Sequence, residues 1–139
     1  MLYYVCKIKY NMTEKLDPII AVTNIKVSSK WYQSVFNWKS LHGGDHFETL
    51  VTENGDVALC LHPWERDEHP TMMNPDITPG NGLILYFRTE YMQTIRQNVE
   101  KMGYPIEDDI HKNPNSSKME FSLRDPDGYF LIISEFHKY

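Results

Sequence analysis

The strongest constraint on the fold is an internal repeat of strand and helix patterns. Residues 17–62 give a short apolar strand, then apolar side chains at helical spacing, and then three further strand patterns. Residues 83–138 repeat this order after a Pro-, Asp- and Asn-rich linker at residues 63–82. The sequence therefore predicts an α+β fold that consists of two tandem βαβββ modules.

Short-range signals define the expected elements. Val27, Trp31 and Val35 form one helical stripe, and Asn37 ends that helix as Gly103 ends the second, because both residue types tolerate the left-handed conformation that follows a helix. The first helix ends at Phe36, and the second has one apolar face that reaches from Tyr91 to Met102. The expected strands cover residues 18–23, 38–42, 47–52 and 57–62 in the first module, and 83–88, 104–110, 118–124 and 129–136 in the second.

The two modules can be aligned by their helix ends and hairpin turns. Asn37 and Gly103 lie 66 positions apart, whereas Gly55 of the Asn-Gly turn and Gly128 of the Asp-Gly turn lie 73 positions apart. The second module therefore contains about seven additional residues. We place them in the polar stretch at residues 111–117.

Composition fits one globular domain of 139 residues. The net charge is −5 and Lys and Arg are scattered, so nucleic acid is not an expected partner. No apolar run has the ~20 residues that a membrane helix needs, and no secretory leader opens the chain, so we expect no membrane association and a cytoplasmic location. Cys6 and Cys60 lack metal-site or disulfide spacing and are expected to be reduced, buried thiols.

Residues 1–16 are expected to be an N-terminal extension. Residues 5–10 alternate as a half-exposed strand and could form an additional edge strand. Met12 is an alternative start of the protein, in which case the preceding residues would result from the choice of initiation codon. We assign no function to this segment.

Two segments carry a family resemblance. Residues 31–38, Trp-Tyr-Gln-Ser-Val-Phe-Asn-Trp, close the first helix, and residues 125–129, Asp-Pro-Asp-Gly-Tyr, form the turn before the last strand. In their places within two βαβββ modules, they resemble the vicinal oxygen chelate superfamily of glyoxalases, bleomycin resistance proteins and extradiol dioxygenases. The resemblance covers residues 17 to about 136. It implies modules that curl into incomplete barrels around a cleft, a small-molecule ligand and a homodimer, with the modules paired either within one chain or by exchange between subunits.

The resemblance also implies where metal ligands would lie. In metal-dependent relatives they come from the first and last strand of each module, and the corresponding positions here are Asp17, Leu59, Leu83 and Ile132. Three aliphatic side chains cannot coordinate a divalent cation, so we expect no metal and no cofactor. A shift of one residue, to Ala58 or Cys60 and to Gly82 or Ile84, assembles no site either.

The alternative is a metal-dependent lyase, isomerase or dioxygenase of the same superfamily with a displaced metal site. His62, Asp17 and Glu135 could form such a site, although solvated loop histidines, such as His42, His46 and His69, are the better explanation of the pattern. No nucleophile lies beside a base at a known spacing, and no glycine loop suits phosphate. Whether the protein is an enzyme therefore stays open.

The favoured interpretation is a small-molecule-binding protein of the glyoxalase and bleomycin resistance type. Core packing or solvated strand ends explain each candidate residue too, and a protein partner whose cleft is filled by its own side chains is the third possibility. Aliphatic and aromatic residues would suit an apolar or aromatic ligand, with charged residues at the mouth. The expected cleft residues are Leu59, Leu83, Ile132, Trp64, Tyr86 and Tyr104, with Asp17, Arg88 and His62 as polar groups.

Overall fold

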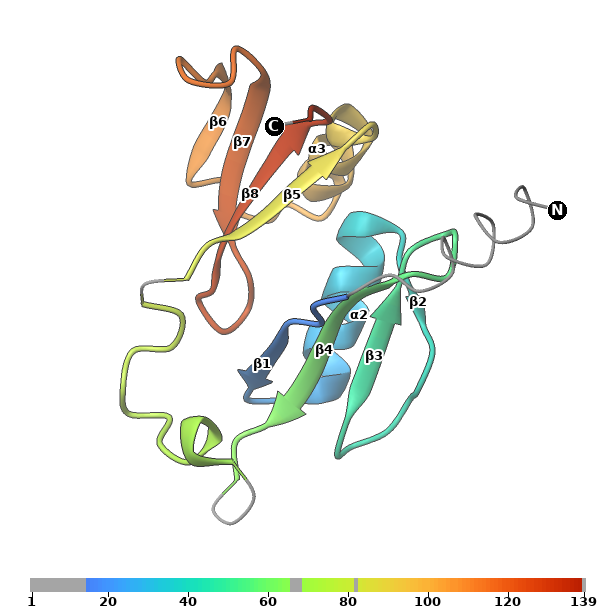
Figure 1. The fold of residues 1–139 in the computed structure, drawn as a ribbon, viewed down its shortest axis with the longest axis vertical. Helices are drawn as coiled ribbons and strands as arrows, with labels where there is room; N and C mark the ends of the chain where they lie inside the picture. The colour runs from blue at the N-terminus through green and yellow to red at the C-terminus, as the bar shows by residue number, and fades with distance from the viewer. Residues whose placement is uncertain (1–14, 66–68, 82, 139) are drawn as a thin grey trace, which may run out of the picture.

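Two four-stranded sheets and two helices make up the part of the chain that the computed structural model describes, residues 15–65, 69–81 and 83–138 (Figure 1). The predicted strand at residues 5–10 and Cys6 lie outside these ranges. The first module contains β1 (Ile19–Val22), α2 (Ile25–Phe36), β2 (Lys39–Ser40), β3 (Glu48–Val51) and β4 (Val57–Pro63). The second contains β5 (Leu85–Thr89), α3 (Met92–Lys101), β6 (Asp108–Lys112), β7 (Met119–Arg124) and β8 (Phe130–Glu135). The predicted α+β fold of two tandem βαβββ modules is confirmed.

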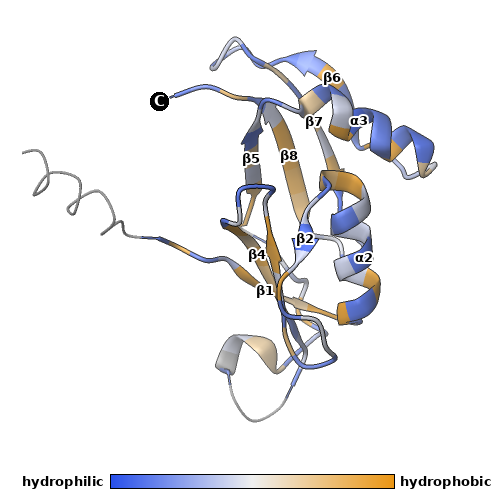
Figure 2. Cartoon of the chain, turned by 90° about the vertical axis from the view of Figure 1, so that its right-hand side faces the viewer, coloured by the Kyte–Doolittle hydropathy of each residue, from blue (hydrophilic) through white to orange (hydrophobic). Residues whose placement is uncertain are grey.

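Both sheets have the same topology. The strand orders are β1-β4-β3-β2 and β5-β8-β7-β6, and in each sheet the first pair is parallel while the others are antiparallel. Among the described residues each sheet keeps two edges, so neither closes into a barrel. Figure 2 shows α2 and α3 on the same side of the two sheets. The opposite side is called the open face below.

One hydrophobic core connects the modules through this helical side. It contains apolar residues of both sheets and both helices, among them Tyr32, Leu59, Phe121 and Leu131, all fully buried. In each strand every second side chain enters this core, because successive side chains point to opposite faces. The alternate residues therefore form the open face.

The β7–β8 turn joins the second module to the first. Asp127 accepts hydrogen bonds from the Thr23 amide and hydroxyl, at 2.8 and 2.7 Å, and from the Ser28 hydroxyl at 3.2 Å. The Tyr129 hydroxyl donates to the Ala21 carbonyl at 2.9 Å. The Asp-Pro-Asp-Gly-Tyr turn thus covers the start of α2 rather than projecting into solvent.

The local sequence explains where α2 begins and ends. Asn24 caps its first turn, since the Asn24 side chain accepts from the Val27 amide at 3.0 Å. Asn37 adopts φ 61°, ψ 25°, and its amide donates to the Gln33 carbonyl. Asn37 therefore ends α2 in the left-handed conformation, as predicted.

Several predicted elements differ from the structure: the strand predicted at residues 38–42 is only Lys39–Ser40, and the strand predicted at residues 83–88 is Leu85–Thr89. β6 covers Asp108–Lys112 instead of residues 104–110, because Pro105 has no amide hydrogen for a ladder bond and pairing with β7 starts only at the Glu107 amide. The predicted linker contains one short 3-10 helix, η1 (Pro70–Met72). Neither helix of the described ranges has the length and apolar character needed to cross a bilayer.

Candidate functional site

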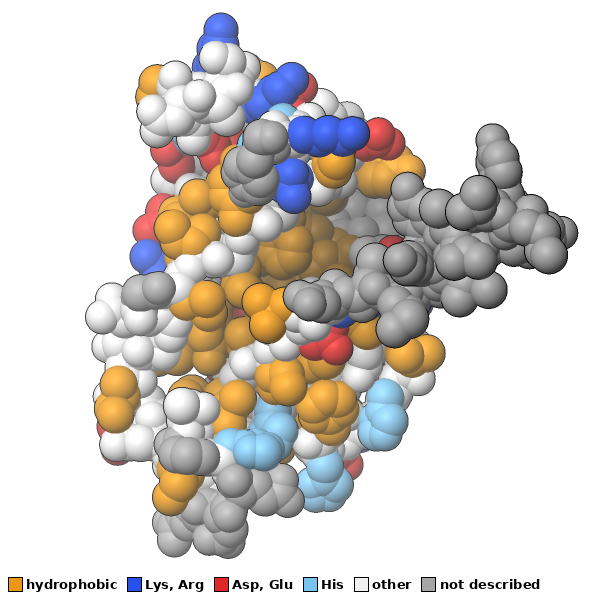
Figure 3. Space-filling model, viewed as in Figure 1, with side chains coloured by type: hydrophobic (Ala, Val, Ile, Leu, Met, Phe, Trp, Pro, Cys, Tyr) orange, Lys and Arg blue, Asp and Glu red, His pale blue; other side chains and the backbone are white. Residues whose placement is uncertain are grey.

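A cavity of about 600 Å³ lies where the two modules meet. It is lined by the end of α2 and Trp38, the β3–β4 hairpin from Thr52 to Ala58, and the segment from Phe87 to Ile95, with Phe136 beside them. Figure 3 shows the open face hollowed near its middle, with a hydrophobic floor. This volume lies in the range of ~300–1,000 Å³ that is typical of small-molecule sites.

Aromatic rings form the apolar part of the cavity. The Phe36 and Trp38 rings stack with centroids 4.4 Å apart and an angle of 14° between their planes, and Phe87 tilts against both at 5.0 and 5.3 Å. The Tyr32 ring also stacks with the Trp38 ring, and their centroids are 5.8 Å apart. These contacts fix the rings in place, so the cavity presents a preformed surface to a planar ligand.

Carboxylates predominate among the charged residues of the lining. The lining contains three carboxylates, those of Glu53, Asp56 and Glu90, and one guanidinium, that of Arg88. Lys15 pairs with Asp56 at 3.6 Å, and the Arg88 guanidinium donates to the His137 carbonyl and lies over the Phe136 ring. The cavity therefore keeps an excess of negative charge, which favours a cation.

The second sheet contributes polar residues to the open face. Tyr86, Ile132 and Ser122 form one row across β5, β8 and β7, and Arg88, Ser134 and Glu120 form the next. Glu120 is 3% exposed, and its Oε1 accepts from the Asn113 amide group while its Oε2 has no hydrogen-bond partner. This face is therefore more polar than the aliphatic lining expected from the sequence.

The structure separates the nine residues predicted to line one cleft. Arg88 lines the cavity, whereas His62 and Trp64 lie at the far end of β4 and just beyond it. Tyr86 and Ile132 lie on the open face of the second sheet. Leu59 belongs to the core and Tyr104 packs against it. Asp17 and Leu83 are exposed, just before β1 and β5.

Two local differences between the modules change the alignment of the predicted positions, and the first explains the position of Leu59. Between the Leu50–Leu59 pair and the Val51–Val57 pair, β4 contains one additional residue, a β-bulge at Ala58. The sequence alignment counted residues from the hairpin turn without allowing for this bulge, and so paired Leu59 with Ile132. In the sheets Leu59 corresponds to Leu131, and both side chains are fully buried. The open-face counterpart of Ile132 is Cys60.

The second difference concerns the helices. The cap of α2 at Asn24 lies thirteen residues before Asn37, whereas the cap of α3 at Tyr91 lies twelve before Gly103. Positions before the helices are therefore 67 apart, and Asp17 corresponds to Ile84 rather than Leu83. The implied ligand positions become Asp17, Cys60, Ile84 and Ile132. Two isoleucines and one thiol still do not suit the metal site of the resembled enzymes.

Cys60 is buried and unreactive in character. Its thiol lies 3.9 Å from the Thr49 hydroxyl, and it is 5% exposed. Burial raises the pKa of the Cys60 thiol and the nearby Asp17 carboxylate raises it further, although the Thr49 contact lowers it. The thiol therefore stays protonated near neutral pH and is a poor nucleophile or metal ligand, as expected for a structural cysteine.

Three side chains near the end of β4 converge. His62, Glu65 and His69 place one possible ligand atom each within 4.8 Å of the others. Of the displaced site considered from the sequence, only His62 belongs to this group. Glu135 instead accepts a hydrogen bond from the Met119 amide in the second sheet, and Asp17 lies before β1.

The sequence interpretation missed most of the cavity lining. Phe36 and Phe87 fit the core pattern of their helix and strand, and in the structure Phe36 belongs to the core and Phe87 packs against it. Tyr91 and Thr94 belong to the start of α3, where no functional motif marks them. Only the internal repeat could have indicated these residues. The hairpin at residues 52–56 corresponds to the β7–β8 turn, which covers α2, so by analogy a contact with α3 of the other module would be expected.

The comparisons with known proteins give a consistent result. The family model described as Glyoxalase/Bleomycin resistance protein/Dioxygenase superfamily matches residues 12–133. No curated protein matches the chain.

Solved structures with the same fold are numerous but distant in sequence. TioX from Micromonospora sp. is 12% identical with a TM-score of 0.70, over 90% of this chain and 100% of that one. A bleomycin resistance determinant encoded on the transposon Tn5 is 13% identical with a TM-score of 0.67, over 91% and 100%. A bleomycin-binding protein in complex with bleomycin is 14% identical with a TM-score of 0.64, over 90% and 100%. These identities establish the fold alone. Because the family model covers most of the sequence, the chain belongs to the Glyoxalase/Bleomycin resistance protein/Dioxygenase superfamily.

Proposed function

We propose that this protein binds a planar aromatic small molecule that carries positive charge, in the cavity between its modules. The observation that carries the proposal is the combination of a stacked aromatic floor, Phe36, Trp38 and Phe87, with a lining in which carboxylates outnumber the guanidinium. An aromatic surface binds a flat ring by burial and stacking, and it also attracts a cation. The carboxylates then select positive charge over negative charge.

The residues at the family's metal-ligand positions support ligand binding rather than metal-dependent chemistry at those positions. Asp17 is the only carboxylate among the four corresponding residues, and Ile84 and Ile132 provide no donor atoms. We therefore propose that ligand binding in the cavity does not require a metal ion. The cavity lining itself lies elsewhere, around Trp38 and Phe87.

The structural relatives support a small-molecule ligand in general. One of them is a bleomycin-binding protein that was solved in complex with bleomycin, so a protein with this fold can bind a small molecule. The identity of 14% transfers no ligand to the present chain. The chemistry of the cavity, and not the name of the relative, defines the proposed ligand.

A homodimer is part of the proposal. In the part of the chain that the structure describes, β1 and β5 are edge strands, and apolar side chains are exposed at or just before them: Leu16 at 94%, Ile19 at 47% and Ile84 at 55%. Apolar groups beside unpaired edges are typical of surfaces that associate. Light scattering during size exclusion should give twice the chain mass, and Ile19→Asp should shift it toward the monomer. A cytoplasmic location stays a prediction.

The binding proposal is tested with two probes that share one ring system. The tricyclic 10-methylacridinium carries a fixed positive charge, and acridine is its neutral counterpart near pH 7.5. Titrations followed by tryptophan fluorescence should show saturable binding of 10-methylacridinium, with an affinity about threefold to tenfold higher than that of acridine. Acridine-9-carboxylate, the anionic member of the series, should bind most weakly.

Two outcomes would contradict the proposal. If none of the three probes binds, the cavity does not accept planar aromatic molecules. If the anionic probe binds as tightly as the cation, the carboxylates Glu53 and Glu90 do not control selectivity. A Glu53→Gln/Glu90→Gln variant checks the second point, since it should reduce the preference for the cation without abolishing binding of acridine.

A further inference from the structure

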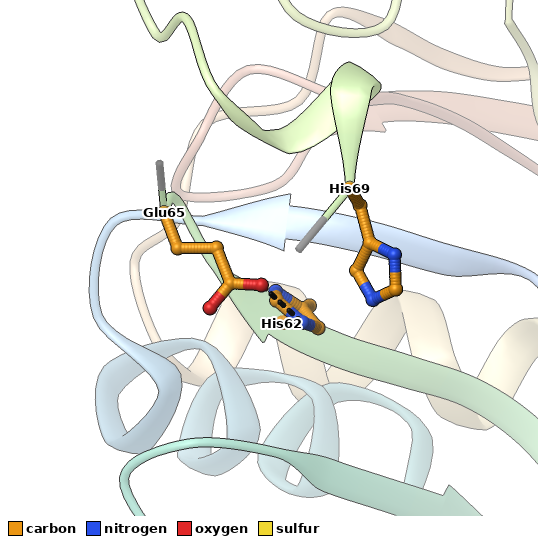
Figure 4. A group of neighbouring side chains, drawn as sticks. All are labelled: His62, Glu65 and His69. Atoms are coloured by element: carbon orange, nitrogen blue, oxygen red, sulfur yellow. Dashed lines mark ion pairs between the residues drawn. The ribbon is translucent and has the colours of Figure 1, made fainter. Parts of the chain in front are cut away.

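The end of β4 and the loop after it bring two imidazoles and one carboxylate together. His62 lies on the open face of β4, Glu65 follows three residues later, and His69 returns to the same place (Figure 4). The His62 Nε2 and Glu65 Oε1 atoms are 3.2 Å apart, and the His62 and His69 ring centroids are 5.1 Å apart. His62 is 6% exposed, Glu65 is half-buried and His69 is exposed, so the group reaches from the interior to the surface.

The hydrogen bond on the other side of the His62 ring defines its tautomer. Nδ1 lies 2.7 Å from the Pro63 carbonyl, which can only accept, so Nδ1 carries the proton. In the neutral ring, Nε2 then presents a lone pair toward Glu65. Metal-binding histidines are oriented in this way, with the second ring nitrogen donating to a backbone carbonyl.

Glu65 presents the complementary feature. Its Oε1 is buried and accepts no hydrogen bond from any residue that the structure describes, although it lies 3.2 Å from Nε2 of His62. When the His62 ring is neutral, two electron-pair donors face each other and repel, and a buried oxygen without a hydrogen bond is costly. A cation bound by both atoms would relieve both problems.

Backbone hydrogen bonds to Met72 hold Glu65 and His69 in place. The Glu65 amide donates to the Met72 carbonyl at 2.8 Å, and the Met72 amide donates to the His69 carbonyl at 3.0 Å. Met72 is buried at 8% exposure. These contacts tie both Glu65 and His69 to Met72 of η1, so the short distance to His62 does not depend on side-chain reach alone.

We propose that His62, Glu65 and His69 form a binding site for a divalent transition metal ion of the Zn²⁺ type. Imidazole and carboxylate ligands suit Zn²⁺, Ni²⁺ and Fe²⁺ better than Mg²⁺ or Ca²⁺, which prefer all-oxygen sites. Tetrahedral Zn²⁺ with ligand bonds of about 2.0–2.1 Å separates neighbouring ligand atoms by about 3.3 Å, and the His62–Glu65 pair already has this separation. Three protein ligands leave a fourth position for water or for a donor atom of a small molecule.

This site is distinct from both places discussed above. None of its three residues occupies a position that corresponds to the family's metal ligands, and none lines the cavity at the module junction. Ala58, which does line the cavity, lies at the opposite end of β4 from His62. The inference therefore goes beyond the proposed ligand binding, and either can fail without the other.

The test uses tag-free, full-length protein that has been treated with a chelator and dialysed. Zn²⁺ is titrated in competition with a chromophoric chelator, and Co²⁺ is added separately because a tetrahedral Co²⁺ site absorbs visible light. We expect one Zn²⁺ per chain. His69→Ala and Glu65→Gln should each weaken Zn²⁺ binding at least about tenfold and reduce the Co²⁺ absorption. Both side chains are more exposed than His62, so these variants should fold, which circular dichroism checks.

Three control variants test whether the loss of Zn²⁺ binding is specific to the proposed ligands. His46→Ala removes an exposed histidine from a different loop, and Cys60→Ala and Asp17→Asn remove the donors at the family's own positions. All three should keep the wild-type affinity for Zn²⁺. The proposal is overturned if the wild type binds no Zn²⁺ stoichiometrically, if His69→Ala and Glu65→Gln bind it unchanged, or if Asp17→Asn or Cys60→Ala weakens it as much.

Discussion

The Tyr32 hydroxyl donates to the Asp125 carboxylate at 2.8 Å, across the boundary between the two modules. Tyr32 is fully buried in α2, and Asp125, at the start of the β7–β8 turn, is 3% exposed. Asp125 also accepts from the Asp127 and Tyr129 amides, at 2.9 Å each, and so organises the turn that covers α2. One carboxylate thus couples the shape of the second hairpin to the helix of the first module.

Replacing Tyr32 with Phe should therefore destabilise the whole chain. The change removes one donor and leaves a buried carboxylate oxygen with one partner fewer, so the free energy of unfolding should fall by about 1–3 kcal/mol in urea denaturation. Tyr91→Phe is the matched control, because Tyr91 is 60% exposed and its loss should change stability by less than about 0.5 kcal/mol. Equal effects of the two variants would show that the inter-module hydrogen bond contributes nothing.

Asp125 should also make stability depend on pH. Burial raises the pKa of Asp125, and hydrogen bonds from Tyr129 and Tyr32 offset this only in part. The folded state therefore holds the proton more tightly than the unfolded chain, whose Asp pKa is about 3.9. As pH rises from about 4 through the folded pKa, the unfolded state binds fewer protons than the folded state and stability falls.

Asp125→Asn removes this titration. The free energy of unfolding of the variant minus that of the wild type should increase as pH rises from about 4 toward 7, measured by urea denaturation at several pH values. A difference that stays constant with pH would show that the Asp125 carboxyl has the same proton affinity in both states. The comparison at one pH also includes the altered hydrogen bond to Tyr32, so the slope and not the offset is the test.

Gly80 should tolerate no side chain. Its φ is 74°, and a Cβ atom there would lie 2.6 Å from Cδ1 of Tyr129, the residue whose hydroxyl contacts Ala21. Gly80→Ala should lower the free energy of unfolding by about 1–3 kcal/mol through strain and displacement of that ring. Gly55→Ala is the control, since Gly55 has a similar φ of 85° but no atom within 4 Å. If the two variants lose the same stability, the contact with Tyr129 is not tight.

Filling the cavity should abolish ligand binding without unfolding the protein. Ala58 lies in the β4 bulge and lines the cavity, and Phe at this position fits a strand while occupying the space in front of Trp38. Ala58→Phe should weaken binding of 10-methylacridinium at least about tenfold in fluorescence titrations. Asn115→Phe, on the exposed β6–β7 turn, adds the same side chain away from the cavity and should leave binding unchanged. Unchanged binding in Ala58→Phe would place the ligand elsewhere.

The sequence predicted the architecture because the repeat is recorded in local signals. Asn37 and Gly103 end the helices, and Gly55 and Gly128 mark the hairpins, since each requires a conformation that few residues adopt. These signals did not determine which strand positions of the first module correspond to which positions of the second. A bulge at Ala58 and a helix one residue shorter are local irregularities that leave no clear pattern in the sequence, yet each moves a side chain to the opposite face of its strand.

The candidate sites were less predictable for a different reason. The cavity depends on how two modules pack, and Phe36 and Phe87 show the same alternation whether they fill a core or border a cavity. His62 was recognised as a polar group on β4, but its approach to Glu65 and His69 depends on a loop that is folded back by hydrogen bonds to Met72. Composition predicts such a segment only as irregular.

The most direct test of the central claim is a map of where an aromatic cation binds. ¹⁵N-labelled protein treated with a chelator is titrated with 10-methylacridinium, and chemical shifts are followed for the backbone amides and the tryptophan indoles. The account predicts saturable shifts at Trp38, in the hairpin at residues 52–56 and at residues 88–91, in the absence of metal. Shifts that concentrate at His62 and Trp64, or that require added Zn²⁺, would contradict it, because the ligand would then bind at the end of β4 and not in the cavity between the modules.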